Sequence, residues 1–241
     1  MTRIYLDQPL NSDQIVTLPE DAARHLVQVL RMRVGDAFTV FNGQGGEYSA
    51  TLHCAGKRDA QALIGAFNNV NRESPLSLTL AQCVSKGERM DYTLQKAVEL
   101  GVTEVMPLLS ERSVVKLDAE RWEKKLEHWR GILISACEQS GRTRIPALHA
   151  VAPLHAWLPQ VSAALKLTLA PEAKQSIRTI SPNQRPIILL VGPEGGLSDA
   201  EIQRTETNSF IPVTLGPRIL RTETAGVAAL AAIQALWGDW H

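Results

Sequence analysis

Short apolar runs alternate with helical patterns in the second half of this chain, and this alternation constrains the fold more than any other feature. The runs cover residues 76–84, 165–169, 187–191 and 211–215, and each has the length of a strand. The last three are suited to strands buried in a parallel sheet. Because helical patterns lie between the runs, we predict an α/β domain with a mainly parallel sheet.

Helix signals in the same half support this prediction. Asp118 is a suitable N-cap for a long helix, and Ser198 with Glu201 forms a capping box at the start of another. Residues 225–237 are apolar nearly all round, so we expect a last helix buried in its own core or against a partner. The long helix has an apolar stripe that we expect to pack in the core, namely Trp122, Leu126, Trp129, Leu133 and Cys137.

The first seventy residues have a different pattern, with strands and one early helix. Alternating apolar residues over 48–52 and 62–66 predict half-buried strands, and successive strands of this kind favour a small barrel. Turn-forming residues at 71–75 interrupt the pattern, so we expect domains at 1–72 and 73–241. The early helix opens at Pro19, and we expect its apolar face to consist of Ala22, Leu26, Val29 and Leu30.

The composition excludes some classes of protein. Lys and Arg number 25 and Asp and Glu number 25, so no large basic field of the kind found in nucleic-acid coat proteins is expected. Cys54, Cys83 and Cys137 lie far apart, without metal-ligand spacing, and we expect reduced thiols and no metal site. The N-terminus has no apolar signal segment, and the longest apolar run is too short to span a membrane. We therefore expect a cytoplasmic protein.

Two glycine-containing loops are the candidate ligand site. Residues 189–198 comprise a strand end, a loop with three glycines and the capped helix, and residues 215–225 repeat the arrangement with a Gly-Pro turn. Ligands bind at the carboxyl ends of strands in open α/β sheets, so we expect two loops at adjacent strand ends to form the walls of one pocket. Tight turns without a ligand would also explain the glycines. The phosphate-binding motifs of ATPases and dehydrogenases are absent.

The sequence of these loops resembles a known family. Gly192-Pro193-Glu194-Gly195-Gly196, followed by residues 215–225, is similar to the SPOUT methyltransferases and, more narrowly, to the bacterial 16S ribosomal RNA uridine-N3 methyltransferases. Further blocks keep that family's order along nearly the whole chain: residues 29–31 with 35–36, 86–91, 95–102, 110–113 and 138–142.

The resemblance implies a fold, a cofactor and partners that the residue pattern alone does not. It implies a PUA-like β-barrel for RNA at the N-terminus and a SPOUT domain with a deep trefoil knot at the C-terminus. It also implies a homodimer with the active site near the subunit interface, S-adenosyl-L-methionine as cofactor, and 16S rRNA or the small ribosomal subunit as substrate.

Site residues follow from the resemblance together with the chemistry of uracil, whose N3 proton must leave during transfer. We expect Arg221 to stabilise the uracil anion and Glu223 to act as a base, although a salt bridge and helix capping are their respective structural alternatives. Local basic residues are expected to bind RNA: Arg24, His25, Arg31, Arg33, Arg112 and Arg142. The expected cofactor pocket consists of Leu169, Gly192, Pro193, Glu194, Gly195, Gly196, Leu215, Gly216, Ile219, Leu220 and Thr224.

Three other functions remain open at this point. A SPOUT enzyme could act on another RNA base or on a ribose 2′-OH, since the domain pattern is shared. A non-catalytic ribosome-assembly protein that binds RNA would not need the intact glycine loop. A nucleotide-binding α/β enzyme is disfavoured because the phosphate motifs are missing.

Overall fold

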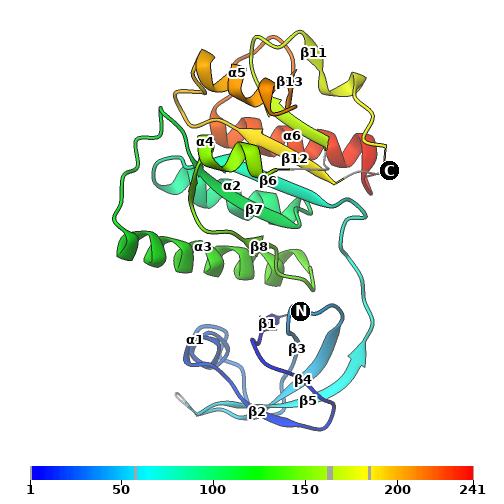
Figure 1. The fold of residues 1–241 in the computed structure, drawn as a ribbon. Coiled ribbons are helices and arrows are strands. Elements are labelled where there is room, and N and C mark those ends of the chain that lie inside the picture. Colours follow the sequence, from blue (N-terminus) through cyan, green and yellow to red (C-terminus); the bar gives the residue numbers. More distant parts are fainter. Residues whose placement is uncertain (1, 57–58, 162–164, 184–185, 241) are drawn as a thin grey trace. The chain divides into compact units, whose positions relative to one another are not determined.

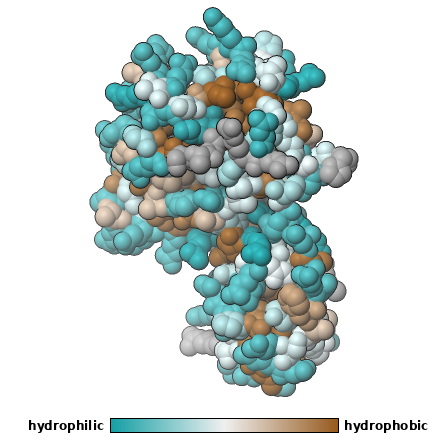
Figure 2. Space-filling view, turned by 45° about the vertical axis from the view of Figure 1, so that its right-hand side comes forward, coloured by the Kyte–Doolittle hydropathy of each residue, from teal (hydrophilic) through white to brown (hydrophobic). Residues whose placement is uncertain are grey.

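The computed structural model describes residues 2–56, 59–161, 165–183 and 186–240. The chain forms two compact units. The first contains the residues up to Glu73 together with Cys137–Ile145, and the second contains Ser74–Ala136 together with the residues from Pro146 onward. Figure 2 shows that hydrophilic side chains cover most of the visible surface of each unit, with apolar groups between them.

The first unit is built on a five-stranded sheet of order β1-β3-β4-β5-β2. β1 pairs with β3 in parallel, whereas the other pairings in this sheet are antiparallel. Side chains such as Phe38, Leu52 and Ile64 are fully buried on its inner face. β1 and β2 are too short to give a period-two signal. The strands are β1 (Arg3–Tyr5), β2 (Ile15–Thr17), β3 (Ala37–Phe41), β4 (Glu47–Cys54) and β5 (Gln61–Asn68).

The early helix departs from its predicted face. It consists of α1 (Glu20–Arg24) and a π-helical turn, η1 (His25–Val29). Leu26 is fully buried, but Val29 is 64% exposed and Leu30 is 42% exposed, so the prediction that these two share the buried face was wrong. The reason is the π turn, which holds more residues than an α-helical turn and rotates the following side chains away from the core.

The segment Cys137–Ile145 joins the first unit through an ion pair. Arg142 is 4% exposed, and its Nε and Nη2 donate to Glu73 Oε2 at 2.8 and 2.6 Å. Glu73 Oε1 also accepts the backbone N–H groups of Thr143 and Arg144. One half-buried carboxylate therefore holds a segment that lies more than sixty residues further along the chain.

The second unit is built on an eight-stranded sheet of order β11-β13-β10-β12-β6-β7-β8, with β9 also paired to β7. All of its pairings among the described residues are parallel, which confirms the predicted parallel α/β sheet. The strands are β6 (Leu78–Cys83), β7 (Glu104–Leu109), β8 (Ala147–Leu148), β9 (Ala152–Pro153), β10 (Leu165–Leu169), β11 (Gln175–Ser176), β12 (Ile187–Val191) and β13 (Ile211–Thr214).

Helices cover both faces of this sheet (Figure 1). On one face an apolar cluster joins Leu154 and Leu158 to strand residues such as Cys83 and Leu190. On the other, α6 packs on α2 and β12. The helices are α2 (Glu88–Glu99), α3 (Ala119–Ser140), α4 (Leu154–Trp157), α5 (Asp199–Thr207) and α6 (Thr222–Trp237), with short 3₁₀ turns η2 (Leu158–Gln160) and η3 (Ile177–Thr179).

The predicted starts of α3 and α5 agree with this structure, whereas α6 begins at Thr222 and not at residue 225 as predicted. Ser198 Oγ accepts the Glu201 N–H, while Glu201 Oε2 accepts the Ser198 N–H, so the capping box is complete. Asp118 Oδ1 accepts the Arg121 N–H at the start of α3. Trp129, Leu133 and Cys137 of the predicted stripe are buried, whereas Trp122 and Leu126 are half-buried. Trp129 Nε1 donates to Asp91 of α2. Within the described ranges, each helix is too short or too polar to traverse a lipid bilayer.

Candidate active site

The two glycine-containing loops leave the same edge of the second sheet, but they do not follow neighbouring strands as predicted. β12 precedes the first loop and β13 precedes the second, and β10 lies between them. The error arose because sequence order does not give the spatial order of strands. The middle strand ends at Leu169, which was predicted as a third wall, so all three predicted parts of the pocket come from consecutive strands of the sheet.

Different structural reasons explain why glycine occupies each of these positions in the two loops. A Cβ on Gly192 would lie 3.0 Å from the Leu197 backbone nitrogen, so this position is too crowded for a side chain. Gly196 has φ +68° and donates its N–H to the buried Pro193 carbonyl. Gly216 has φ +117°. A Cβ on Gly196 or Gly216 would meet no atom within 4 Å, so open space adjoins the backbone of both loops.

A buried hydroxyl connects the end of β12 to the start of α6. Thr222 Oγ1 donates to the Gly192 carbonyl at 2.7 Å. Gln82 of β6 donates its Nε2 to the same hydroxyl at 3.1 Å and to the Cys83 carbonyl at 3.0 Å. Thr222 is 7% exposed and Gln82 is fully buried. These bonds hold the first loop against the residues that follow the second loop, and we name them the Thr222 latch.

Glu194, at the tip of the first loop, is held by groups that precede and begin α2. Its Oε1 accepts the Lys86 N–H at 2.8 Å and Arg89 Nη1 at 3.1 Å. Burial alone would raise the pKa of this carboxyl, but its hydrogen bonds with backbone N–H groups and with Arg89 outweigh burial and lower the pKa. Glu194 is therefore a carboxylate at neutral pH, and it ties the loop to α2.

Arg112 also supports the glycine loop. It is exposed, and its Nη1 donates to the Gly195 carbonyl at 2.8 Å and to the Leu197 carbonyl at 3.3 Å. This residue was predicted to bind RNA, yet its guanidinium already binds two loop carbonyls. Its observed contacts are those of a residue that shapes the loop.

The two predicted catalytic residues lie at the start of α6. Arg221 is the exposed N-cap residue of this helix. The Glu223 side chain is 16% exposed, and its Oε1 lies 3.9 Å from Arg89 Nε. Its Oε2 is buried and has no hydrogen-bond partner in the described part of the chain. Arg221 and Glu223 therefore lie on one turn, and the sequence did not indicate that Arg89 faces Glu223.

The remaining predicted pocket residues differ in exposure. Leu215 and Leu220 are half-buried, whereas Thr224 is exposed. Ile219 is 84% exposed, which is unusual for a large apolar side chain in a loop beside open backbone. Thr222, which was not predicted, makes the contact with the first loop.

The predicted RNA-binding residues of the first unit fall into two groups. Arg24, His25, Arg31 and Arg33 are exposed on and after α1. Arg142 is buried in its ion pair with Glu73, and this burial argues against the predicted RNA contact. The basic-residue pattern could not reveal the difference, because the partner of Arg142 is distant in sequence.

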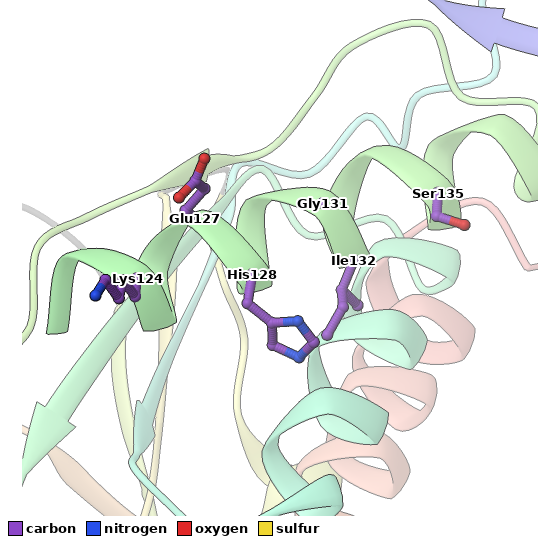
Figure 3. Close-up of a pocket in the computed structure, with 6 residues that line it drawn as sticks. All are labelled: Lys124, Glu127, His128, Gly131, Ile132 and Ser135. Atoms are coloured by element: carbon purple, nitrogen blue, oxygen red, sulfur yellow. The ribbon is translucent and has the colours of Figure 1, made fainter. Parts of the chain in front are cut away.

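Two hollows lie away from these loops. One, about 480 Å³, follows a single stripe of α3 around Gly131, as Figure 3 shows. The other, about 330 Å³, lies beside α4 and α5 and is lined by residues such as His155 and Arg204. Neither contains a predicted site residue. Over the described ranges, no three His, Cys, Asp or Glu side chains are placed to hold a metal ion.

Comparison with known families identifies the chain. Residues 72–234 match the model of the RNA methyltransferase domain, and residues 18–65 match that of the RNA methyltransferase PUA domain. The chain belongs to the RNA methyltransferase family. The matched region of this RNA methyltransferase includes both glycine-containing loops, the Thr222 latch and Arg89.

Relatives of this RNA methyltransferase match over almost the full length of both chains. The ribosomal RNA small subunit methyltransferase E of Buchnera aphidicola subsp. Schizaphis graminum is 35% identical over 238 residues, which are 98% of this chain and 97% of the relative. The Bacillus subtilis protein of the same name is 32% identical, with 97% and 96% covered.

Solved structures are also similar to this RNA methyltransferase. The Neisseria gonorrhoeae ribosomal RNA small subunit methyltransferase E bound to S-adenosyl methionine is 42% identical, with a TM-score of 0.94 and both chains fully covered (100%). A Legionella pneumophila structure in complex with bound SAM is also 42% identical, with a TM-score of 0.96 and 99% and 98% covered.

Proposed function

We propose that this protein transfers a methyl group from S-adenosylmethionine to N3 of a specific uridine in 16S rRNA of the small ribosomal subunit. The observation that supports this most directly is the pair of glycine-containing loops at one sheet edge, joined by the bond between Thr222 and Gly192, in a member of the RNA methyltransferase family. The named relatives are small-subunit rRNA methyltransferases.

The loops have the properties that the cofactor requires. Open space adjoins Gly196 and Gly216, so a ligand can approach backbone N–H and carbonyl groups without meeting a Cβ. Leu169, Leu215 and Leu220 are half-buried and offer apolar contacts. Two similar structures contain the bound cofactor. We therefore assign the cofactor pocket to these residues together with Pro193, Glu194 and the other predicted members: Gly192, Gly195, Ile219 and Thr224.

The residues at the start of α6 would manage the proton and charge of the acceptor. When bound, S-adenosylmethionine supplies a methyl group already activated by its sulfonium. Uracil N3 carries a proton on the pairing edge, so the target must be unpaired when it enters the site. We assign Glu223 to accept that proton and Arg221 to stabilise the developing negative charge on a uracil oxygen.

The first unit would hold the RNA. Arg24, His25, Arg31 and Arg33 are exposed beside the π-helical turn, together with the apolar Val29 and Leu30. Arginines next to exposed apolar side chains offer contacts to phosphates and to unpaired bases. We propose that the five-stranded sheet closes into the PUA-like barrel that presents this surface.

The proposal also includes a trefoil knot, a homodimer and a cytoplasmic location. The knot is supported by the chain path, because β10 separates β13 from β12, yet α6 follows β13 and begins at the end of β12. The dimer is supported by the apolar character of α6 and by two exposed apolar side chains at its C-terminal end. Leu236, in the last turn of α6, is 42% exposed, and Trp240, just after the helix, is 51% exposed. Light scattering at micromolar concentration should give twice the mass of the chain.

The substrate assignment is tested by nucleoside analysis. Deletion of the gene in its host should abolish one 3-methyluridine in digested 16S rRNA, and purified protein with S-adenosylmethionine should restore it. Loss of a ribose-methylated or differently methylated nucleoside would instead show another acceptor. An unchanged nucleoside profile would show that the protein binds RNA without modifying it.

The site assignment is tested by separate variants. Gly196→Trp should abolish calorimetric binding of S-adenosylmethionine, because the indole fills the open space beside the loop. Arg221→Ala and Glu223→Ala should bind the cofactor but lose most methyl transfer. Arg130→Ala, which removes an exposed arginine of α3, is the matched control and should retain activity. Full activity in both Arg221→Ala and Glu223→Ala would remove both residues from the mechanism.

A further inference from the structure

Arg89 is placed between the two parts of the candidate site. It lies in the first turn of α2, directly after Gly87 and Glu88. Its Nη1 donates to Glu194 Oε1 at 3.1 Å, and its Nε lies 3.9 Å from Glu223 Oε1. Glu194 belongs to the first glycine-containing loop, and Glu223 belongs to the helix that follows the second. One guanidinium therefore faces a carboxylate from each side of the proposed pocket.

The orientation of the Glu223 side chain depends on the group that contacts its Oε1, which is the Arg89 guanidinium. Its other oxygen is buried without a hydrogen-bond partner among the described residues, so it does not anchor the side chain. Without Arg89, two carboxylates would face the same space and repel each other. A guanidinium can meet both because its nitrogens lie in a rigid fork, whereas a lysine offers a single charged nitrogen.

We propose that Arg89 is a positioning residue that couples the cofactor loop to Glu223, so that the loop geometry sets the orientation of the proposed base. This inference rests on the proposed function. Arg89 is 45% exposed, and surface ion pairs contribute little to overall stability. The contribution of Arg89 to the stability of the fold is therefore small, and its replacement should instead change the geometry of the site.

Kinetics and cofactor binding test this role. Arg89→Ala should lower kcat roughly 10- to 100-fold, the range expected when a reacting group is misplaced, with a much smaller change in KM for RNA. Arg89→Lys should recover only part of the loss. In the Glu223→Gln background, Arg89→Ala should add little further loss, because the two residues act through one contact. Arg204→Ala, which removes an arginine of similar exposure in α5, is the matched control and should leave kcat unchanged.

Native-state hydrogen exchange supplies a readout that does not need activity. Arg89→Ala should increase amide exchange in both residues 192–198 and residues 215–225, whereas Arg204→Ala should not. Unchanged exchange in these segments, or additive losses in the double variant, would overturn the coupling. If the wild-type protein transferred no methyl group, the proposed function would fail, and the exchange measurement would still decide whether Arg89 positions the loops.

Discussion

Replacement of Thr222 by valine tests how the Thr222 latch stabilises the second unit. Valine keeps the shape of threonine but has no hydroxyl. The substitution would remove the 2.7 Å bond to the Gly192 carbonyl and the 3.1 Å bond from Gln82 Nε2. Gln82 is fully buried and Thr222 is 7% exposed, whereas Gly192 is half-buried. The loss of the hydroxyl is therefore felt mainly at Gln82 Nε2, which water does not reach.

The expected loss follows from the groups left without a partner. An unsatisfied buried polar group costs about 1–3 kcal/mol. Gln82 Nε2 keeps its bond to the Cys83 carbonyl and already lies 3.5 Å from the Gly192 carbonyl, so part of the cost is recovered. We expect Thr222→Val to lower the free energy of unfolding by about 2 kcal/mol, which changes the folded-to-unfolded ratio roughly 30-fold.

Tryptophan fluorescence during urea unfolding measures this loss in the free energy of unfolding of the second unit. All five tryptophans of the chain lie in the second unit, so the signal reports on its unfolding alone. Thr222→Ser keeps the hydroxyl and is the matched control. Calorimetry should also show weaker binding of S-adenosylmethionine in Thr222→Val, because Gly192 loses its tether. Equal stability of the valine and serine variants would refute the reasoning.

Three further predictions follow from buried or capping groups. Ser198→Ala should lower the free energy of unfolding by about 1 kcal/mol in the same fluorescence assay, because the capping box loses its hydroxyl; an unchanged midpoint would contradict this. Glu73→Ala should destabilise the first unit by about 3 kcal/mol, since it removes the carboxylate that pairs with the buried Arg142 guanidinium and accepts two backbone N–H groups, and faster amide exchange confined to that unit is the measurement. Burial raises the pKa of the Cys83 and Cys137 thiols to about 12, so only the half-buried Cys54 should react with a disulfide reagent at pH 8 before unfolding; rapid reaction of all three would show that the cores open.

Local signals in the sequence determined much of the fold. The capping box at Ser198, the N-cap at Asp118 and the stripe around Trp129 were correct because each depends on residues within a few positions of one another. The parallel α/β sheet was correct because its strands are apolar runs separated by helices. The face of the early helix was wrong because a single π turn changes the period on which such a prediction depends.

Contacts between distant segments decided the rest. That β10 lies between β12 and β13 cannot be inferred from chain order, because strand neighbours are chosen by packing. The bond from Thr222 to Gly192, the position of Arg89 between Glu194 and Glu223, and the burial of Arg142 each join residues far apart in sequence. A charged side chain looks the same in sequence whether it binds RNA, pairs with a carboxylate or supports a loop. The sequence by itself therefore determined where the first loop begins and ends, although it placed the start of α6 three residues too late. Only the tertiary structure decided which side chains hold the two loops together.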